Sequence, residues 1–204
     1  QAWLKIRGNN FTQAANIFPV ACVSVGDYSY GDLYIEYYNQ SQEKITIGKY
    51  CCIAKNVKFI TGGGHNYRHI TSYPFKNMVT ENSIQEATTK GPIIIEDDVW
   101  IGHSCIILSG VKIGKGAVIG AGSVVAKDIP PYAIFCGTEV KKFRFSKEII
   151  DKLLCFDLDY INFYRAKPLF NVLYTEVTEK NIDDILNEIV GEDKNEDIGR
   201  NRFI

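Results

Sequence analysis

Three histidines, His65, His69 and His103, are the side chains of this sequence best suited to acid–base chemistry near neutral pH. An imidazole has an ordinary pKa of about 6.5, so a neutral ring is available at pH 7 to take a proton from a hydroxyl group. His65 follows three consecutive glycines, Gly62 to Gly64, which would let the loop approach a substrate closely. A lone histidine is more often structural than catalytic, but a position on a glycine-rich loop favours a catalytic role for His65. For His69 the alternatives are a catalytic role and a hydrogen bond within the loop.

The element that must position this loop is a six-residue repeat in the second half of the chain. An aliphatic residue stands at Ile95, Ile101, Ile107, Ile113, Ile119 and Val125, and a compact residue stands two positions before most of them. A helix repeats every 3.6 residues and a strand every two, so neither explains a period of six. A solenoid of short parallel strands with a turn every six residues does, with the aliphatic residue inside the coil. The same spacing occurs earlier at Ile47, Ile53 and Phe59, and more weakly at Val25.

The repeat is absent between roughly Thr61 and Pro92, and loops this long inside a domain are usually functional. We expect residues 1–145 to form the β-solenoid catalytic domain with an excursion over about 61–92, and residues 146–204 to form a helical extension with a flexible tail. Ser146 is a suitable N-cap for a first helix with apolar residues as far as Ile161. A second helix is expected from about Thr178 to Val190, ended by Gly191.

Composition restricts the function further. The 204 residues suit one main domain with appendages, and a net charge of −1 argues against a broad nucleic-acid-binding surface. No apolar run is long enough to span a bilayer. Six cysteines are present and none forms a CxxC pair, which favours reduced thiols in a cytoplasmic protein over disulfides or metal sites.

The repeat and its flanking motifs, over about residues 23–160, resemble the hexapeptide-repeat acyltransferases. These are left-handed parallel β-helices, an exception to the usual right-handed crossover. The block Thr71-Ser72-Tyr73-Pro74-Phe75 resembles the xenobiotic acetyltransferase branch, which includes chloramphenicol and streptogramin O-acetyltransferases and polysaccharide-modifying relatives. Counting back from this block with the family spacing reaches His65 as the catalytic histidine.

Three departures from that branch bear on the acceptor. Arg68 stands where the family often has an aspartate, and His69 is an additional histidine. The drug-modifying members commonly carry Tyr-Tyr-Asp where this chain reads Tyr30-Gly31-Asp32. At these positions the chain resembles the polysaccharide-modifying relatives more than the drug-modifying members.

The resemblance also implies which residues bind the cofactor and the acceptor. Acetyl-CoA would be the co-substrate, and its pantetheine arm would lie along Ala121, Ala126 and Lys127, while its 3′-phosphate would meet Lys141 and Arg144. A solvated charge run is the alternative for these basic residues. His103 would face the cofactor arm, or be an exposed turn residue.

The resemblance further implies that Trp100 lines the acyl site, although it could instead pack between coils. An acceptor wall would include Tyr30, Asp32 and Tyr37, with packing at a trimer interface as an equal alternative for the tyrosines.

The function implied is an acetyl-CoA-dependent O-acetyltransferase without a metal, acting on a sugar hydroxyl in capsular or other surface polysaccharide synthesis. The resemblance implies a homotrimer with active sites between subunits. The alternatives are an acetyltransferase for chloramphenicol or streptogramins, an N-acetyltransferase for a nucleotide-linked amino sugar, a zinc hydratase similar to the γ-type carbonic anhydrases, and a solenoid with a structural or binding role.

Overall fold

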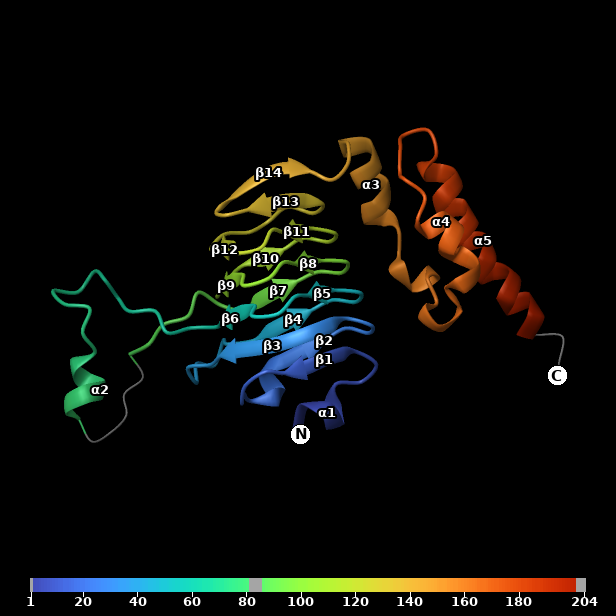
Figure 1. The fold of residues 1–204 in the computed structure, drawn as a ribbon. Helices are drawn as coiled ribbons and strands as arrows, with labels where there is room; N and C mark the ends of the chain where they lie inside the picture. Colours follow the sequence, from blue (N-terminus) through green and yellow to red (C-terminus); the bar gives the residue numbers. More distant parts are fainter. Residues whose placement is uncertain (1, 81–85, 201–204) are drawn as a thin grey trace. The chain divides into compact units, whose positions relative to one another are not determined.

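The structure, a computed structural model, describes residues 2–80 and 86–200, apart from the side chains of residues 165 and 192–200. The chain divides into two compact units, Gln1–Arg144 and Phe145–Ile204. Figure 1 shows the strands in the first unit and most of the helices in the second. In the described part of the chain, no helix is both long and apolar enough to cross a membrane.

The first unit is built from short strands that stack in parallel ladders (Figure 1). One ladder joins β2, β4, β7 and β10, and the other described strands belong to a larger sheet, in which β13 and β14 pair antiparallel. The strand bounds are β1 Phe11–Ala14, β2 Val23–Val25, β3 Tyr30–Glu36, β4 Ile45–Ile47, β5 Cys52–Ile53, β6 Lys58–Ile60, β7 Ile93–Ile95, β8 Trp100–Ile101, β9 Ile106–Leu108, β10 Lys112–Ile113, β11 Val118–Ile119, β12 Val124–Val125, β13 Ala133–Cys136 and β14 Glu139–Phe143.

The pairing register shows that one coil takes three six-residue units. Ile95 pairs with Ile113, which is 18 positions later in the chain. Ile47 pairs with Ile95, which is 48 positions later, so this coil contains 30 additional residues. These lie between β6 and β7, where the chain leaves the stack and returns (Figure 1).

The repeated aliphatic residues form the core of the coils, as predicted. All six from Ile95 to Val125 are at most 1% exposed, and the preceding compact residues Val99, Cys105, Val111, Ala117 and Ser123 are also buried. The small residue at the corner has a steric reason at Gly102, where an added Cβ would lie 2.6 Å from the backbone nitrogen of Ala121 in the next coil. Close coil stacking therefore requires glycine there.

Residues before the first coil extend the same ladder. Helix α1 (Ala2–Ile6) precedes β1, which pairs with β3, and the 3₁₀ helix η1 (Val20–Cys22) precedes β2. The Trp3 side chain is buried, packs against Phe18 and donates a 3.0 Å hydrogen bond to Thr12 Oγ1.

The segment between β6 and β7 contains one short helix, α2 (Phe75–Val79), and an antiparallel bridge between Gly64 and Thr88. The bridge joins the outgoing and returning parts of the segment close to the coils. Residues 81–85 of the predicted excursion lie outside the described part of the chain.

The helical unit contains the two predicted helices with different bounds, and it has additional short helices between them. Helix α3 (Lys147–Cys155) has the predicted N-cap Ser146 but ends before Leu158 and Ile161, because Phe156 is extended and Asp157 caps the 3₁₀ helix η2 (Leu158–Tyr160). Two further 3₁₀ helices, η3 (Phe163–Arg165) and η4 (Lys167–Leu169), lead to α4 (Phe170–Leu173).

The last helix, α5 (Ile182–Arg200), begins later and ends later than predicted. It begins at Ile182 because Asn181 Oδ1 accepts hydrogen bonds from Thr178 N and Oγ1, at 2.7 and 3.0 Å, which forms a turn. It passes Gly191, which does not adopt a left-handed φ and costs only about 1 kcal/mol inside a helix. The predicted flexible tail is therefore helical to Arg200, and residues 201–204 lie outside the description.

Candidate active site

The ring of His65 is oriented by a backbone group of its own loop. His65 is exposed, and its Nδ1 lies 2.7 Å from the carbonyl oxygen of Ser72. A carbonyl oxygen can only accept, so Nδ1 must carry the hydrogen of the neutral ring. The lone pair of that ring is then on Nε2, to which no described residue is hydrogen-bonded. This arrangement orients a base whose accepting atom is available to a ligand.

The predicted motif surrounds the same histidine. A pocket of about 260 Å³ is lined by His65, Asn66, His69, Thr71, Ser72, Tyr73, Pro74, Lys76, Glu86 and Thr88. Tyr73 packs edge-on against Phe75, with ring centroids 4.8 Å apart. The Thr71–Pro74 block and His65 therefore belong to one site. None of the coil residues predicted to bind cofactor or acceptor lines this pocket in the described chain.

His69 has a structural partner. The Asn66 side chain accepts from Arg68 N through Oδ1 at 3.0 Å, which directs its amide nitrogen to His69 Nε2, also at 3.0 Å. His69 Nε2 is thus an acceptor and is already used. This contact favours the prediction of a loop hydrogen bond over that of a catalytic role.

Tyr30 and Trp100 stand on the outer face of the coils in one lateral row. Tyr30 pairs with Cys52, and Cys52 pairs with Trp100. The Tyr30 and Trp100 side chains are 52% and 55% exposed, so Trp100 does not pack between coils. A hydrogen bond with Cys52 raises the pKa of Tyr30. Asp32 lies further along β3, half-buried.

Gly31 between Tyr30 and Asp32 has a backbone that excludes a side chain. Its φ is +123°, and an added Cβ would lie 2.0 Å from the carbonyl oxygen of Ile53. A tyrosine cannot occupy position 31 without displacing the adjacent coil.

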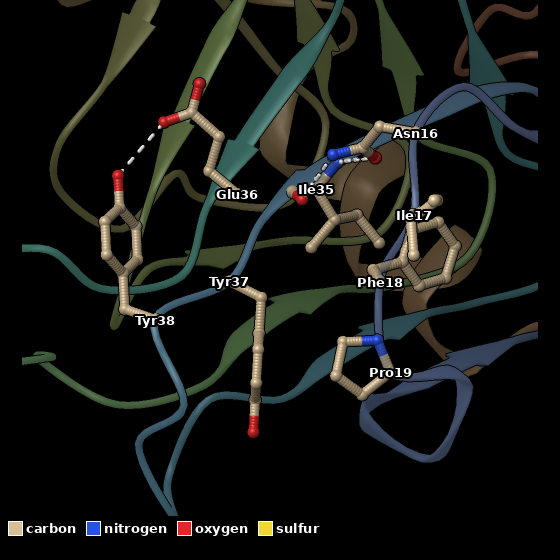
Figure 2. A pocket seen from close by; sticks show the side chains of 8 residues that line it. All are labelled: Asn16, Ile17, Phe18, Pro19, Ile35, Glu36, Tyr37 and Tyr38. Carbon is tan, nitrogen blue, oxygen red and sulfur yellow. Dashed lines mark hydrogen bonds between the residues drawn. The ribbon is translucent and has the colours of Figure 1, made fainter.

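Tyr37 lines a second, larger groove that the sequence did not reveal (Figure 2). Its volume is about 640 Å³, and its lining residues are Asn16, Ile17, Phe18, Pro19, Ile35, Glu36, Tyr37 and Tyr38. Tyr38 Oη donates to Glu36 Oε2 at 3.1 Å, and the Asn16 amide pairs with both backbone polar groups of Ile35. A hydrogen bond with Cys22 raises the pKa of Tyr37. The groove therefore combines aromatic faces with a carboxylate.

The residues predicted for the pantetheine arm are exposed on the coils. Ala121, Ala126 and Lys127 all face outward around β12. Gly122 N donates to the carbonyl oxygen of His103 at 2.8 Å, so the His103 turn lies beside Ala121. His103 Nε2 is 3.2 Å from Asn56 Nδ2.

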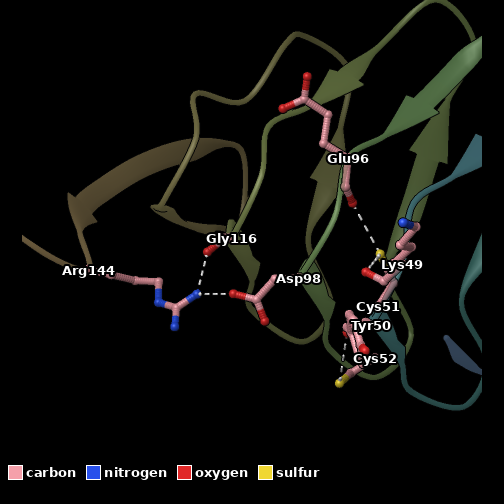
Figure 3. Close-up of polar contacts among 8 residues, drawn as sticks. All are labelled: Lys49, Tyr50, Cys51, Cys52, Glu96, Asp98, Gly116 and Arg144. Atoms are coloured by element: carbon pink, nitrogen blue, oxygen red, sulfur yellow. Dashed lines mark hydrogen bonds and ion pairs between the residues drawn. The ribbon is translucent and has the colours of Figure 1, made fainter. Parts of the chain in front are cut away.

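The two basic residues predicted for the 3′-phosphate already have acidic partners. Lys141 Nζ lies 2.5 Å from Glu139 Oε1. Arg144 contacts Asp98 Oδ2 at 3.1 Å and donates to Gly116 O at 2.7 Å (Figure 3). Burial raises the pKa of Asp98, and the Arg144 guanidinium opposes this rise. Arg144 therefore links the end of the coils to a turn, and a phosphate would have to compete with Asp98.

All six cysteines are free thiols. Cys51 and Cys105 are fully buried. Cys51 Sγ contacts the Glu96 carbonyl oxygen at 3.1 Å (Figure 3), and burial raises the pKa of this thiol to about 12. Such a thiol is unreactive. Among the described residues there is no group of three His, Cys, Asp or Glu side chains placed to hold a metal.

Known proteins are similar in sequence to this chain over most of its length. Residues 92–127 match the family described as bacterial transferase hexapeptide (six repeats). A probable macrolide acetyltransferase from Lysinibacillus sphaericus is 38% identical over 155 residues, covering 72% of this chain and 84% of the relative. The chain belongs to the hexapeptide-repeat acetyltransferase family.

Other members are also similar to this acetyltransferase. A chloramphenicol acetyltransferase from Klebsiella aerogenes is 37% identical, over 65% of this chain and 72% of the relative. A solved maltose O-acetyltransferase from Clostridium difficile 630 is 31% identical over 66% of each chain, with a TM-score of 0.49.

Proposed function

We propose that this acetyltransferase transfers an acetyl group from acetyl-CoA to a sugar hydroxyl, in the synthesis of capsular or other surface polysaccharide. The observation that carries the proposal is the 2.7 Å contact between His65 Nδ1 and Ser72 O, which leaves Nε2 as the accepting atom. In an acetyltransferase, that atom is suited to take the proton of an acceptor hydroxyl.

In the proposed reaction, the two ring nitrogens of His65 have different roles: Nε2 transfers the proton, and Nδ1 holds the ring in place. His65 Nε2 removes the hydroxyl proton as the oxygen attacks the thioester carbonyl carbon. The tetrahedral intermediate collapses with cleavage of the C–S bond, and the imidazolium returns the proton to the departing CoA thiolate. Throughout the reaction, the Ser72 carbonyl oxygen accepts the hydrogen bond from Nδ1–H and stabilises the charged ring. General acid–base catalysis of this type contributes roughly 10²–10⁴-fold in rate.

The coil surface supplies the binding groups for acetyl-CoA. The outward-facing residues Ala121, Ala126 and Lys127 would accompany the pantetheine arm beside His103, and Lys141 would meet the 3′-phosphate. Trp100 would cover the acyl group. Lys141 also has an acidic partner, but both side chains of that pair are exposed, whereas Arg144 is less exposed and is held by both Asp98 and Gly116 O. We therefore give Arg144 a smaller part in phosphate binding than Lys141.

Two features support a sugar as the acceptor. The groove at Tyr37 offers aromatic faces for the apolar C–H surface of a sugar ring, and Glu36 can accept its hydroxyl hydrogens (Figure 2). The backbone at Gly31 excludes the second tyrosine that drug-modifying members carry there. Tyr30 and Asp32 would complete the wall. The second candidate is an antibiotic acceptor, which the names of the macrolide and chloramphenicol relatives favour.

The active site would be completed by a second subunit. Among the described residues, those that line the pocket of His65 all belong to its own excursion, whereas the binding groups above lie on the coils. A homotrimer of left-handed β-helices, with the excursion of one subunit against the coils of the next, would bring them together.

An acceptor panel tests the proposed substrate class. CoA release from acetyl-CoA would be followed with mono- and oligosaccharides, nucleotide-linked amino sugars, chloramphenicol, a macrolide and a streptogramin. We expect kcat/KM to be highest for a saccharide hydroxyl. Turnover of an antibiotic with none for any saccharide would reverse the assignment, and acetylation confined to an amino sugar nitrogen would replace it with N-acetyl transfer.

A further inference from the structure

Glu43 is a fully buried carboxylate that the proposed reaction does not use. The residue is 1% exposed, and no described basic side chain forms an ion pair with it. A buried charge without an ion-pair partner is costly unless hydrogen bonds compensate it. Glu43 therefore requires an explanation in terms of what its hydrogen bonds hold together.

Neutral donors surround both oxygens of this carboxylate. Oε2 accepts from Tyr38 N at 2.7 Å and from Thr61 Oγ1 at 2.6 Å, and Oε1 accepts from Gln40 N at 3.1 Å. Hydrogen bonds to a charged acceptor are roughly twice as strong as neutral ones. Two donors belong to the turn after β3, and the third belongs to the residue where the chain leaves the coils. The carboxylate thus bridges segments that are 18 residues apart.

The Thr61 end of this bridge is the root of the His65 excursion. Thr89 Oγ1 donates to Thr61 O at 2.6 Å, and Gly64 and Thr88 exchange two backbone hydrogen bonds of 2.9 and 2.8 Å. His65 is the next residue after Gly64. The turn after β3 also reaches the returning part, because Gln40 Nε2 donates to Ala87 O at 2.7 Å. The start of the His65 loop is therefore fixed from two sides.

The Tyr38 end of the bridge belongs to the aromatic groove. The Tyr38 ring packs on the glycines before His65, since a Cβ added at Gly63 would lie 2.5 Å from it. Its hydroxyl donates to Glu36 in the groove. Glu43 consequently contacts the backbone of a groove residue and the side chain at the root of the catalytic loop.

We propose that Glu43 is a positioning residue that holds the His65 loop in register with the groove at Tyr37 and Tyr38. The proposal rests on the assignment of His65 as the general base. Glu43 does not touch a substrate; it acts through Thr61 and Tyr38 on where the imidazole and the acceptor stand.

The test compares Glu43→Gln and Thr61→Val with three controls in the full chain. Glu43→Gln keeps the shape of the side chain but places an amide NH₂ opposite at least one of the three donors. Thr61→Val removes the hydroxyl that contacts Glu43 Oε2 and, at 2.8 Å, the carbonyl oxygen of Glu36. Thr61→Ser keeps the hydroxyl, Glu179→Gln removes an exposed carboxylate, and His65→Ala reports on the base itself. We would measure kcat and KM with acetyl-CoA and a saccharide acceptor, together with amide hydrogen exchange at Gly64 and Thr88.

We expect kcat to fall about 10- to 100-fold in Glu43→Gln and Thr61→Val, because displacements near 1 Å can cost that much. KM for acetyl-CoA should stay within about twofold of wild type, as for a group that acts on the transition state alone. Exchange at Gly64 should accelerate, and Thr61→Ser and Glu179→Gln should behave as wild type. A purely structural role would lower thermal stability without this separation of kcat from KM.

The proposal is overturned if Glu43→Gln and Thr61→Val keep wild-type kcat while His65→Ala is inactive. If Glu43→Gln does not fold, the comparison of kcat between Thr61→Val and Thr61→Ser tests the proposal. If His65→Ala retains full turnover, the general base is wrong, which is a failure of the proposed function and is distinguishable from the first outcome.

Discussion

Gly63, two residues before the proposed base, is required both by its backbone conformation and by the side chain that packs against it. Its φ is +79°, and an added Cβ would lie 2.5 Å from the Tyr38 ring. Alanine in the left-handed region costs about 1–2 kcal/mol on its own. The clash of its Cβ with the Tyr38 ring adds to this cost. Gly8 offers a matched control, because its φ is +66° and nothing lies within 4 Å of its added Cβ.

We therefore predict that Gly63→Ala lowers kcat at least about tenfold by displacing His65, whereas Gly8→Ala lowers only the free energy of unfolding. Denaturant unfolding and steady-state kinetics on both variants measure the two effects separately. Equal losses of stability with unchanged kcat in both would show that the Tyr38 contact does not position the loop.

The roles of single residues could be predicted only where the residues that indicate the role are close together in the sequence. The candidate base was identifiable because His65, the glycines and the Thr71–Phe75 block are close in the chain. The hydrogen-bond partner of His65 Nδ1 could not be predicted, because it is a backbone carbonyl oxygen, and every residue type has one. The contact of Arg144 with Asp98 was also hidden, since coil stacking brings together residues 46 positions apart.

At the scale of elements, the six-residue period predicted the coils because each aliphatic residue is buried by the same geometry in every turn. The turns between the strands carry a second periodic feature. The third residue after each aliphatic is left-handed in five successive turns, at Asp98, Ser104, Gly110, Gly116 and Gly122. Aspartate and glycine are types that tolerate this conformation, so four of the five positions were recognisable.

Helix ends were predicted less well because local hydrogen bonds decide them. Asp157 begins a new 3₁₀ turn where the apolar spacing suggested a continuing helix, and Asn181 delays the start of α5. The groove at Tyr37 was equally hidden, because Asn16 to Pro19 carry no period and meet β3 only after folding. The bridging carboxylate Glu43 stands in a polar turn where the sequence suggests solvent exposure.

At the scale of the whole molecule, we propose that a second copy of the chain completes the active site. The outer face of the coils carries a row of exposed aromatic side chains, with Phe11, Tyr30 and Trp100 at 42%, 52% and 55% exposure. Exposed apolar surface of this kind is typical of an interaction site. Packing against a neighbouring subunit would bury part of it and complete the site of His65.

We therefore predict that sedimentation equilibrium gives three times the chain mass of 23.0 kDa, and that activity is lost on dilution into monomers. The measurement is sedimentation together with turnover over the same concentration range. A monomer with undiminished kcat would contradict the shared active site.

The central claim is that the Nε2 atom of His65 takes the acceptor proton, and one substitution tests it most directly. Turnover and acetyl-CoA binding should be measured separately on His65→Ala, with His69→Ala as the control, because His69 shares the pocket but bonds to Asn66. The account predicts a loss of kcat of about 10²–10⁴-fold in His65→Ala with binding retained, and near-normal kcat in His69→Ala. Wild-type turnover in His65→Ala, or loss of turnover only in His69→Ala, would contradict it.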